Sequence, residues 1–335
     1  MEPPEYVCPK CKSSLTATES GFRRGRCALR YPLFFGIPDF RLGVGDDIRY
    51  LEMQKIEGIL KEYEHAGKFD RLMERHVRAH TTSHLVAHEL AYELAWKRRG
   101  SEVKERLQTL QRRLVGQHER GADRYLDVGC GKGAALITFC REFEDVYGVD
   151  VVPRYLVFAK ILAQEGGASH LHLACASADA LPFRSEMFDL VTALDLIEHL
   201  PRQIEGLREI WRTVREGGLA YLNSPNRFSL FALEDHVRLW GVGFLPRKWM
   251  GRYVRLVRRY AYEGVRLLSV FELARLLGNL PDCTYCIEGL MVTYREGMAK
   301  KMLAALPVLV WALNTFARWF VPSYNVTMRK ADSNP

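Results

Sequence analysis

The sequence predicts an α/β fold: a seven-stranded, mostly parallel sheet with helices on both faces. From residue 124 onwards, short apolar runs alternate with helical stretches, which is the pattern of parallel strands joined by crossover helices. A glycine-rich loop follows the first run, and acidic residues follow or end the next ones. The seven strands are expected at residues 124–130, 145–150, 171–177, 188–194, 219–225, 284–291 and 324–330.

The composition is that of a folded globular protein, because 48% of the 335 residues are hydrophobic and 26% are charged. Lysine and arginine outnumber acidic residues by 48 to 40, and several arginines gather between Arg247 and Arg266. This local excess of positive charge indicates a phosphate-bearing partner or an anionic membrane surface. The eight cysteines are sparse and no signal peptide begins the chain, so we expect a cytoplasmic location.

The first 120 residues divide into two predicted parts. Residues 1–45 are rich in Cys, Gly, Pro and Arg, which indicates a small module of loops and hairpins. Residues 46–120 contain little glycine or proline and repeat apolar residues at helical spacing, so we expect two or three helices that cover the active site. Four histidines recur every four residues on one predicted helix: His76, His80, His84 and His88.

These four histidines do not predict a metal site. Four residues at this spacing extend over about 18 Å of helix axis, so they cannot share one ion. We expect a polar helix face that lines the active site or is solvated.

The glycine loop Gly129–Gly133 runs from the first strand into the helical stretch 134–140. Glycine allows positive φ and close approach of the backbone to a ligand, and the following helix offers unpaired N–H groups to an anionic group. A second strand ends at Asp150, where a carboxylate can accept hydrogen bonds from both hydroxyls of a ribose. A third strand leads to Asp179, whose carboxylate could bind the amino group of adenine. By themselves Asp150 and Asp179 could equally be a helix cap and a turn residue.

Five motifs occur in order between residues 120 and 225: LDVGCGKG, YGVD, ADALPF, FDLVTALDLIEHL and REGGLAYLNSPN. Together they resemble the class I S-adenosylmethionine-dependent methyltransferases, in particular the branch of quinone-biosynthesis and glycan-tailoring enzymes. The resemblance implies a Rossmann-like sheet and S-adenosylmethionine as cofactor. An acidic residue before the glycine loop fits that cofactor, because it carries a sulfonium and an ammonium where a dinucleotide carries phosphates.

The resemblance also implies the residues that bind the cofactor. The loop and the acid before it would surround the methionine part, Asp150 would hold the ribose, and Asp179 would bind the adenine. The full set is Asp127, Gly129, Cys130, Gly131, Gly133, Asp150, Val151, Asp179, Ala180 and Leu194.

His199 is the candidate general base, with Asp195 as its catalytic partner. His199 follows the fourth strand, at the edge of the sheet where such folds bind ligands, and its ordinary pKa of about 6.5 suits a proton acceptor. Asp195 could orient the imidazole or close over the cofactor. Alternatively His199 only holds the loop, and Asp195 and Glu198 are acids at a helix N-terminus, stabilised by the helix dipole.

Cys8, Cys11 and Cys27 are candidate zinc ligands. With the segment Tyr31–Phe40 they resemble the small zinc ribbon that precedes some methyltransferases. A structural zinc ion needs four ligands, and the position three after Cys27 is Arg30. We therefore expect less than one zinc ion per chain.

Residues 121–335 are predicted to be the methyltransferase domain, with an acceptor-binding insertion at 225–268 and an apolar helix at 300–321. The insertion mixes aromatic and basic residues, which suits an anionic membrane surface or an RNA strand. We expect methyl transfer to an oxygen of a small lipid-linked or glycan-linked molecule, by a cytoplasmic protein that can bind peripherally to a membrane. The alternatives are an RNA base as acceptor and a non-catalytic partner protein that keeps the cofactor fold.

Overall fold

The computed structural model describes residues 5–23, 29–81, 90–91, 100–105, 107, 124–168, 170–230, 232–234, 236–290 and 319–331. The chain forms two compact units. The first consists of residues 1–192 and 212–218, and the second of residues 193–211 and 219–335.

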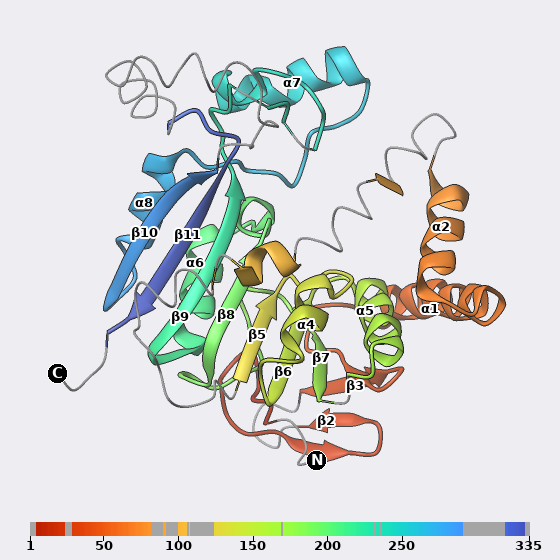
Figure 1. The fold of residues 1–335 in the computed structure, drawn as a ribbon. Helices are drawn as coiled ribbons and strands as arrows, with labels where there is room; N and C mark the ends of the chain where they lie inside the picture. The colour runs from red at the N-terminus through yellow and green to blue at the C-terminus, as the bar shows by residue number, and fades with distance from the viewer. Residues whose placement is uncertain are drawn as a thin grey trace. The chain divides into compact units, whose positions relative to one another are not determined.

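A seven-stranded sheet with the order β10-β11-β9-β8-β5-β6-β7 confirms the predicted fold class (Figure 1). β5 pairs in parallel with β6 and β8, and β6 pairs in parallel with β7. β11 is antiparallel to β9 and to β10, so the sheet is mixed. The strands are β5 Arg124–Val128, β6 Asp145–Asp150, β7 Leu171–Cys175, β8 Phe188–Leu194, β9 Val214–Pro225, β10 Cys283–Leu290 and β11 Ser323–Lys330.

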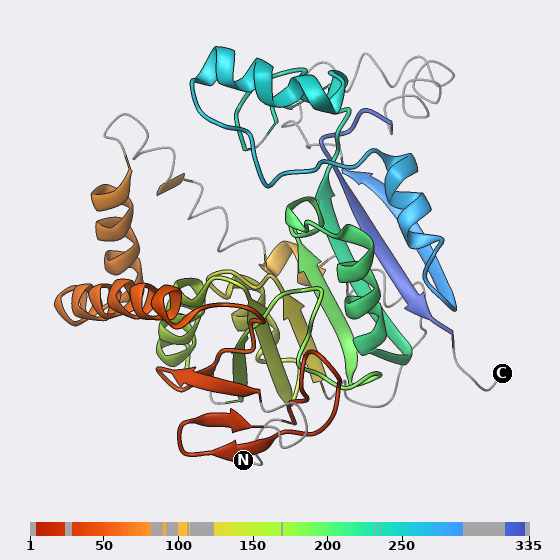
Figure 2. The ribbon, with the colours of Figure 1, turned by 180° about the vertical axis from the view of Figure 1, so that it is seen from behind.

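Local signals in the sequence place the helices that follow the strands. α4 (Ala134–Phe139) begins after the glycine loop, and α5 (Pro153–Glu165) begins with a proline, a residue favoured at the first helical position. α6 (Gln203–Thr213) connects β8 to β9. α8 (Val270–Leu277), a blue helix in Figure 2, starts with the predicted capping box. The Ser269 side chain accepts from the Glu272 backbone, and the Glu272 side chain accepts from the Ser269 backbone.

The core of the first unit is aromatic. Phe183 and Phe188 lie with their ring centroids 5.0 Å apart, and Tyr147 contacts both at 5.6 and 5.2 Å. Both phenylalanines are almost completely buried. Edge-to-face packing of this kind adds about 0.5–1.5 kcal/mol per pair beyond the burial of area, so these contacts stabilise the strands that carry the candidate cofactor residues.

The N-terminal segment forms a separate four-stranded antiparallel sheet, with the strands in sequence order. Its strands are β1 Thr16–Thr18, β2 Gly21–Arg23, β3 Arg30–Phe34 and β4 Ile37–Pro38. The backbone N–H of Val7 donates to Pro182 O at 2.9 Å, and that of Phe40 donates to Cys175 O at 2.7 Å. These bonds attach the module to the loops around β7 within the first unit.

Two helices follow this module, α1 (Asp46–Ala66) and α2 (Phe69–His80). α1 ends at Gly67, whose φ of 69° is a common glycine C-terminal geometry. α2 ends at Thr81, whose backbone is extended at φ −116°. The predicted single helix through all four histidines is therefore wrong, because a β-branched threonine leaves the helical conformation after His80. His84 and His88 lie outside the described residues.

The predicted insertion at 225–268 has a small core of its own. It contains the 3-10 turn η2 (Val242–Phe244) and the helix α7 (Arg247–Arg258). Val237, Val242, Met250 and Val254 are buried together. Most of the predicted apolar helix at 300–321 lies outside the described residues, and in the part of the chain that the structure describes no helix is both long and apolar enough to cross a membrane.

Candidate active site

The glycine loop leaves β5 with three glycines at positive φ: Gly129 at 74°, Gly131 at 51° and Gly133 at 89°. A β-carbon on Gly133 would lie 2.9 Å from Ala159 Cβ, so this glycine is needed for α4 to pack against α5. A β-carbon on Gly131 would meet nothing within 4 Å. Gly131 therefore faces open space, which leaves its backbone accessible to a ligand.

Asp150, at the end of β6, holds this loop in place. Its Oδ2 accepts the backbone N–H of Gly131 at 2.9 Å, and its Oδ1 accepts that of Val152 at 2.8 Å. Burial raises the pKa of this carboxyl group above its ordinary value, and these hydrogen bonds oppose the rise. The backbone of Val151 also hydrogen-bonds to this carboxylate, which has about four acceptor sites, so capacity for a further donor remains.

Asp127 is buried inside β5 with 3% of its surface exposed. Thr192 Oγ1 donates to its Oδ1 at 2.6 Å, and the same hydroxyl lies 2.6 Å from Tyr125 OH. This chain of hydroxyl groups orients a negative charge two residues before the glycine loop. A cationic ligand group at the loop would be attracted by that charge.

The residues predicted to bind adenine, Asp179 and Ala180, lie in the loop after β7. Ser177 Oγ donates to Asp179 Oδ1 at 2.5 Å, and the backbone N–H of Ala180 donates to Ser177 O at 3.0 Å. Val151, directly after Asp150, is an exposed apolar residue. Such an apolar side chain at the end of a strand suits contact with a flat ring. Cys130 and Leu194, the remaining two predicted cofactor residues, are buried and partly buried, respectively.

Asp195, directly after β8, has an unusual backbone. Its φ of 47° is positive, which costs a residue other than glycine about 1–3 kcal/mol. A hydrogen bond from its backbone N–H to Asn223 O, 3.1 Å long, holds it there. Backbone strain of this kind concentrates at functional sites, so it supports a role for the loop that follows.

Glu198 is not at the start of a helix. It lies in the 3-10 turn η1 (Ile197–His199), whereas α6 begins at Gln203, and only 1% of Glu198 is exposed. The interpretation of Glu198 as an acid at the N-terminus of the following α-helix therefore does not fit, because α6 begins only at Gln203. Burial in a tight turn makes it part of the site's interior.

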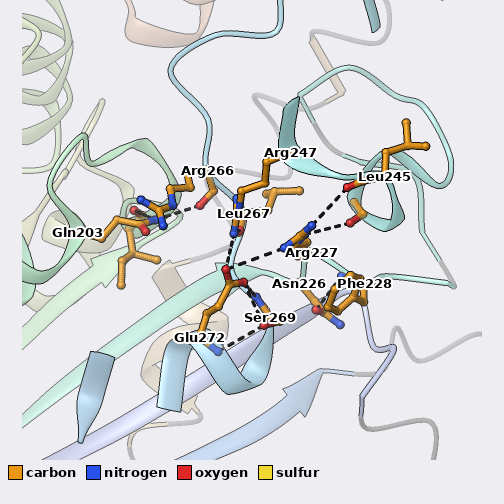
Figure 3. Close-up of polar contacts among 12 residues, drawn as sticks. Gln203, Asn226, Arg227, Phe228, Leu245, Arg247, Arg266, Leu267, Ser269 and Glu272 are labelled. Atoms are coloured by element: carbon orange, nitrogen blue, oxygen red, sulfur yellow. Dashed lines mark hydrogen bonds and ion pairs between the residues drawn. The ribbon is translucent and has the colours of Figure 1, made fainter. Parts of the chain in front are cut away.

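A polar network holds this turn against the insertion (Figure 3). The Gln203 side chain donates to Ile197 O and to Arg266 O, both at 2.9 Å, and the backbone N–H of Arg266 donates to Glu198 O at 2.7 Å. Since one amide group contacts both segments, the turn that carries His199 is tied to the end of the insertion.

Glu272 joins the same network from α8 (Figure 3). Arg247 donates to Glu272 Oε1 at 2.7 Å and to Leu267 O at 2.9 Å, and Arg227 donates to the carbonyl oxygens of Gly243 and Leu245. The side chains of Arg227 and Arg247 thus fix the base of the insertion. Arg247 is a structural residue of the basic stretch that the sequence assigns to the acceptor.

His199 Nε2 lies 3.1 Å from Nε2 of His236, with the ring planes 76° apart. His236 Nδ1 donates to Glu234 Oε1 at 2.6 Å, and Tyr262 OH donates to the same oxygen at 3.2 Å. Burial, followed by the nearby His236, lowers the pKa of His199. His199 is therefore unprotonated at neutral pH, as a general base must be.

Sequence reasoning missed Glu234, His236 and Tyr262. They lie in the insertion, 35 to 63 residues after His199, and no motif links them to it. The signal that was available is a carboxylate and a histidine two residues apart in an insertion assigned to acceptor binding.

The zinc prediction stays open. Cys8 is buried with its Sγ 3.2 Å from Tyr31 OH, and Cys11 is exposed with its Sγ 3.7 Å from Ser13 Oγ. Cys27 lies outside the described residues. Arg30, at the position where a fourth ligand was expected, begins β3 and is exposed.

Residues 126–222 match the family model described as a methyltransferase domain. The chain is 31% identical over 137 residues to the ubiquinone biosynthesis O-methyltransferase of Paracidovorax citrulli, covering 40% of this chain and 57% of that protein. It is 29% identical over 168 residues to the protein of the same name from Vibrio vulnificus, covering 49% and 66%. The chain therefore spans less than two thirds of the length of these relatives.

Among solved structures, the YcgJ protein from Bacillus subtilis is similar over 64% of this chain and 94% of its own, with 19% identity and a TM-score of 0.42. The domain is identified by its strand order and by the family model that it matches, and not by the structural similarity to YcgJ. Residues 126–222 form a methyltransferase domain by this match and by the strand order, as the sequence predicted. The comparisons support a methyltransferase with S-adenosylmethionine as its cofactor.

Proposed function

We propose that this protein transfers a methyl group from S-adenosylmethionine to a hydroxyl oxygen of a small, lipid-linked acceptor. The observation that carries the oxygen assignment is His199, an exposed histidine in the turn after β8 whose Nε2 lies 3.1 Å from Nε2 of His236 and whose pKa is lowered by desolvation. A hydroxyl group needs a base to take its proton, whereas many nitrogen and sulfur acceptors do not. The two relatives named ubiquinone biosynthesis O-methyltransferases support the same class of acceptor.

The residues of the first unit suit the binding of this cofactor. Asp127 would attract the sulfonium and ammonium groups, Asp150 would hold the ribose, and Asp179 would take the adenine amino group. Transfer from a sulfonium is an in-line displacement that disperses positive charge, so alignment in a dry pocket supplies most of the rate. His199, four residues after Asp195, would then accept the proton of the hydroxyl.

The surface of α7 supports a lipid-linked acceptor. Leu256 is 82% exposed and Trp249 is 52% exposed. The guanidinium of Arg252 lies 5.9 Å from the centroid of the Trp249 ring, and Arg255 is also exposed. A helix face with aromatic, apolar and basic side chains binds at the interface of an anionic bilayer, where burial and charge act together.

Methyl-labelled cofactor tests the proposal. The purified protein is incubated with labelled S-adenosylmethionine and a cell extract, and the lipid, small-molecule and RNA fractions are analysed by mass spectrometry. We expect label in a hydroxyl-bearing lipid as a methyl ether, and none with His199→Gln. Label confined to a soluble glycan would contradict the lipid link.

Label in RNA would overturn the proposal in favour of a nucleobase acceptor, for which the net charge of +8 is the motivating feature. A protein that binds S-adenosylhomocysteine in calorimetry but labels no fraction would be a non-catalytic partner. Saturable binding of NAD without any S-adenosylhomocysteine heat would contradict the cofactor itself.

A further inference from the structure

His199 and His236 meet through their Nε2 atoms, although 37 residues separate them in the sequence. A hydrogen bond between two imidazoles has a direction, because one ring must donate and the other must accept. The direction decides which nitrogen of His199 is left as a base. It can be derived from the groups behind His236.

Glu234 fixes the proton of His236. A carboxylate only accepts, so the proton in the 2.6 Å contact with Glu234 Oε1 lies on Nδ1 of His236. A neutral His236 then has a bare Nε2, and the proton between the two rings belongs to Nε2 of His199. A neutral His199 with its proton on Nε2 carries its lone pair on Nδ1.

The Glu234 carboxylate is itself held in place on both oxygens. Val237 N–H donates to Oε2 at 2.8 Å, and Tyr262 OH donates to Oε1 at 3.2 Å. Burial, together with the charge of Glu234, raises the pKa of Tyr262, so this hydroxyl keeps its proton and remains a donor. Buried partners of this kind fix the orientation of Glu234 and, through it, that of His236.

We propose that Glu234 and His236 are positioning residues that set the tautomer of His199, so that Nδ1 of His199 takes the proton of the acceptor. This role rests on the function proposed above, whereas the tautomer can be measured in the protein alone. In the transfer, the carbon–sulfur bond breaks as the carbon–oxygen bond forms, and the hydroxyl proton moves to Nδ1. S-adenosylhomocysteine leaves as a neutral thioether, and the positive charge ends on the imidazolium.

The surrounding groups accommodate that imidazolium. A hydrogen bond with the backbone of Gly264 and the charges of Asp195 and Glu234 all favour the charged form of His199, while burial and His236 oppose it. Among the described residues, Glu198 and Arg247 also act on this cluster, through Tyr262. The site therefore takes up a proton that is later released to solvent, as turnover requires.

A divalent cation is the competing occupant of the space between the rings. One possible donor atom each from Glu198, His199 and His236 lies within 4.8 Å of the others. A bound ion would take the lone pair of Nε2 on both rings, so both histidines would carry their proton on Nδ1. The hydrogen-bonded chain from Glu234 through His236 to His199 predicts one tautomer of His199, and a bound ion predicts the opposite one.

Long-range 1H–15N spectra of histidine-labelled protein report which ring nitrogen carries a proton. The two signals are assigned by comparison with His199→Gln and His236→Gln, and spectra are recorded before and after a chelator. We expect a proton on Nε2 of His199 and on Nδ1 of His236, with no change after chelation. A proton on Nδ1 of His199, or a chelator-dependent change at both rings, would overturn the proposal whatever the acceptor is.

Glu234→Gln should reverse the direction of the hydrogen bonds from Glu234 through His236 to His199, while the side chains keep their positions. Because Val237 N–H needs an acceptor, the amide oxygen is expected at the position of Oε2, which leaves the amide nitrogen facing His236. His236 then accepts at Nδ1, donates from Nε2 and forces the proton of His199 onto Nδ1. We expect kcat to fall by about 10²–10⁴-fold, as for loss of a general base or of its correct tautomer, while KM changes little.

Asp145→Asn is the matched control, because Asp145 Oδ1 lies 3.2 Å from His172 Nε2 in a carboxylate–histidine pair outside the candidate site. It should leave kcat unchanged. Glu234→Asp keeps an accepting carboxylate and should recover part of the activity. Equal activity of Glu234→Gln and the control, with thermal stability unchanged in both, would contradict the positioning role. So would an unchanged His199 tautomer in Glu234→Gln.

Discussion

Asp150 Oδ2 accepts the backbone N–H of Gly131 at 2.9 Å, so the end of β6 holds the loop that follows β5. The same carboxylate is the predicted ribose ligand. Removing it therefore affects the loop and the ligand together, and a test of ribose binding must separate the two effects.

Asp150→Asn should weaken binding of S-adenosylhomocysteine by about 1–3 kcal/mol, because charge-assisted hydrogen bonds to the ribose are lost. Calorimetry with S-adenosylhomocysteine and with its 2′-deoxy analogue separates the causes. In the wild type the missing hydroxyl should cost affinity, and in Asp150→Asn it should cost much less. If the analogue loses the same affinity in both proteins, Asp150 holds only the loop.

Gly133→Ala and Gly131→Ala should fail in different ways. The new methyl group at Gly133 would lie 2.9 Å from Ala159 Cβ at a φ of 89°, so thermal unfolding should shift downwards by several degrees. At Gly131 the methyl group meets open space, so only the backbone strain of an alanine at a φ of 51° should lower stability, and we expect a smaller shift than for Gly133→Ala but a large loss of cofactor affinity. Stability and calorimetry of both variants check this contrast. A stable Gly133→Ala protein would show that α4 and α5 can separate at low cost.

The acid limb of the pH profile of kcat/KM should lie at a lower pH than an ordinary histidine would give. Burial and His236 lower the pKa of His199 below its ordinary value of about 6.5, so the unprotonated base persists to more acidic pH. We expect kcat/KM to fall only when the pH drops below that value, and His199→Gln to remove the limb along with most of the activity. An acid limb above the ordinary value, or one retained in His199→Gln, would assign the base to another residue.

Charge reversal on α7 should release the protein from anionic vesicles. Arg252→Glu with Arg255→Glu removes attraction to phosphatidylserine-containing liposomes, so flotation should fall at low salt and become insensitive to further salt. Arg258 is spared because its Nε donates to Val237 O at 2.9 Å. The matched control is Arg71→Glu with Arg75→Glu, the same change in charge on exposed positions of α2. Wild-type protein that never floats would point to a soluble acceptor.

Purified, untagged protein should contain less than one zinc ion per chain by elemental analysis, because Arg30 stands where a fourth ligand was expected. A full equivalent that disappears in Cys8→Ser would show that another residue completes the site. Cys140→Ser, a buried cysteine of the first unit, serves as the control for a general effect of cysteine loss.

The sequence was sufficient to predict the sheet and the cofactor loop, because both depend on local patterns. Apolar runs of strand length, glycines where φ is positive, and the Ser269–Glu272 capping box each act within a few residues. The end of α2 was misplaced because apolar residues keep their helical spacing in the sequence beyond Thr81. The backbone, however, leaves the helical conformation at Thr81. Propensity at a single residue is a weak signal against a long periodic pattern.

The relay behind His199 could not be predicted, because it depends on how the insertion folds back. The contact between His236 and His199 depends on the core around Val237 and on the bonds of Gln203 to Ile197 and Arg266. Contacts of this range follow from tertiary packing. The burial of Glu198 could not be predicted for the same reason, because its sequence position suggested the N-terminus of a helix.

The insertion leaves and rejoins the fold at one place. Asn226 and Leu268 form a parallel bridge, and the backbone N–H of Arg227 donates to Leu268 O at 3.0 Å. Neighbouring strands lie about 4.8 Å apart, so the two positions are close. Because the bridge is parallel, a replacement segment would have to be long enough to turn the chain back before it rejoins at Leu268. The insertion could thus be exchanged as a unit, because a different segment could be joined at the same two residues while the strands on either side stay intact. Such a segment could bring another acceptor and another partner for His199.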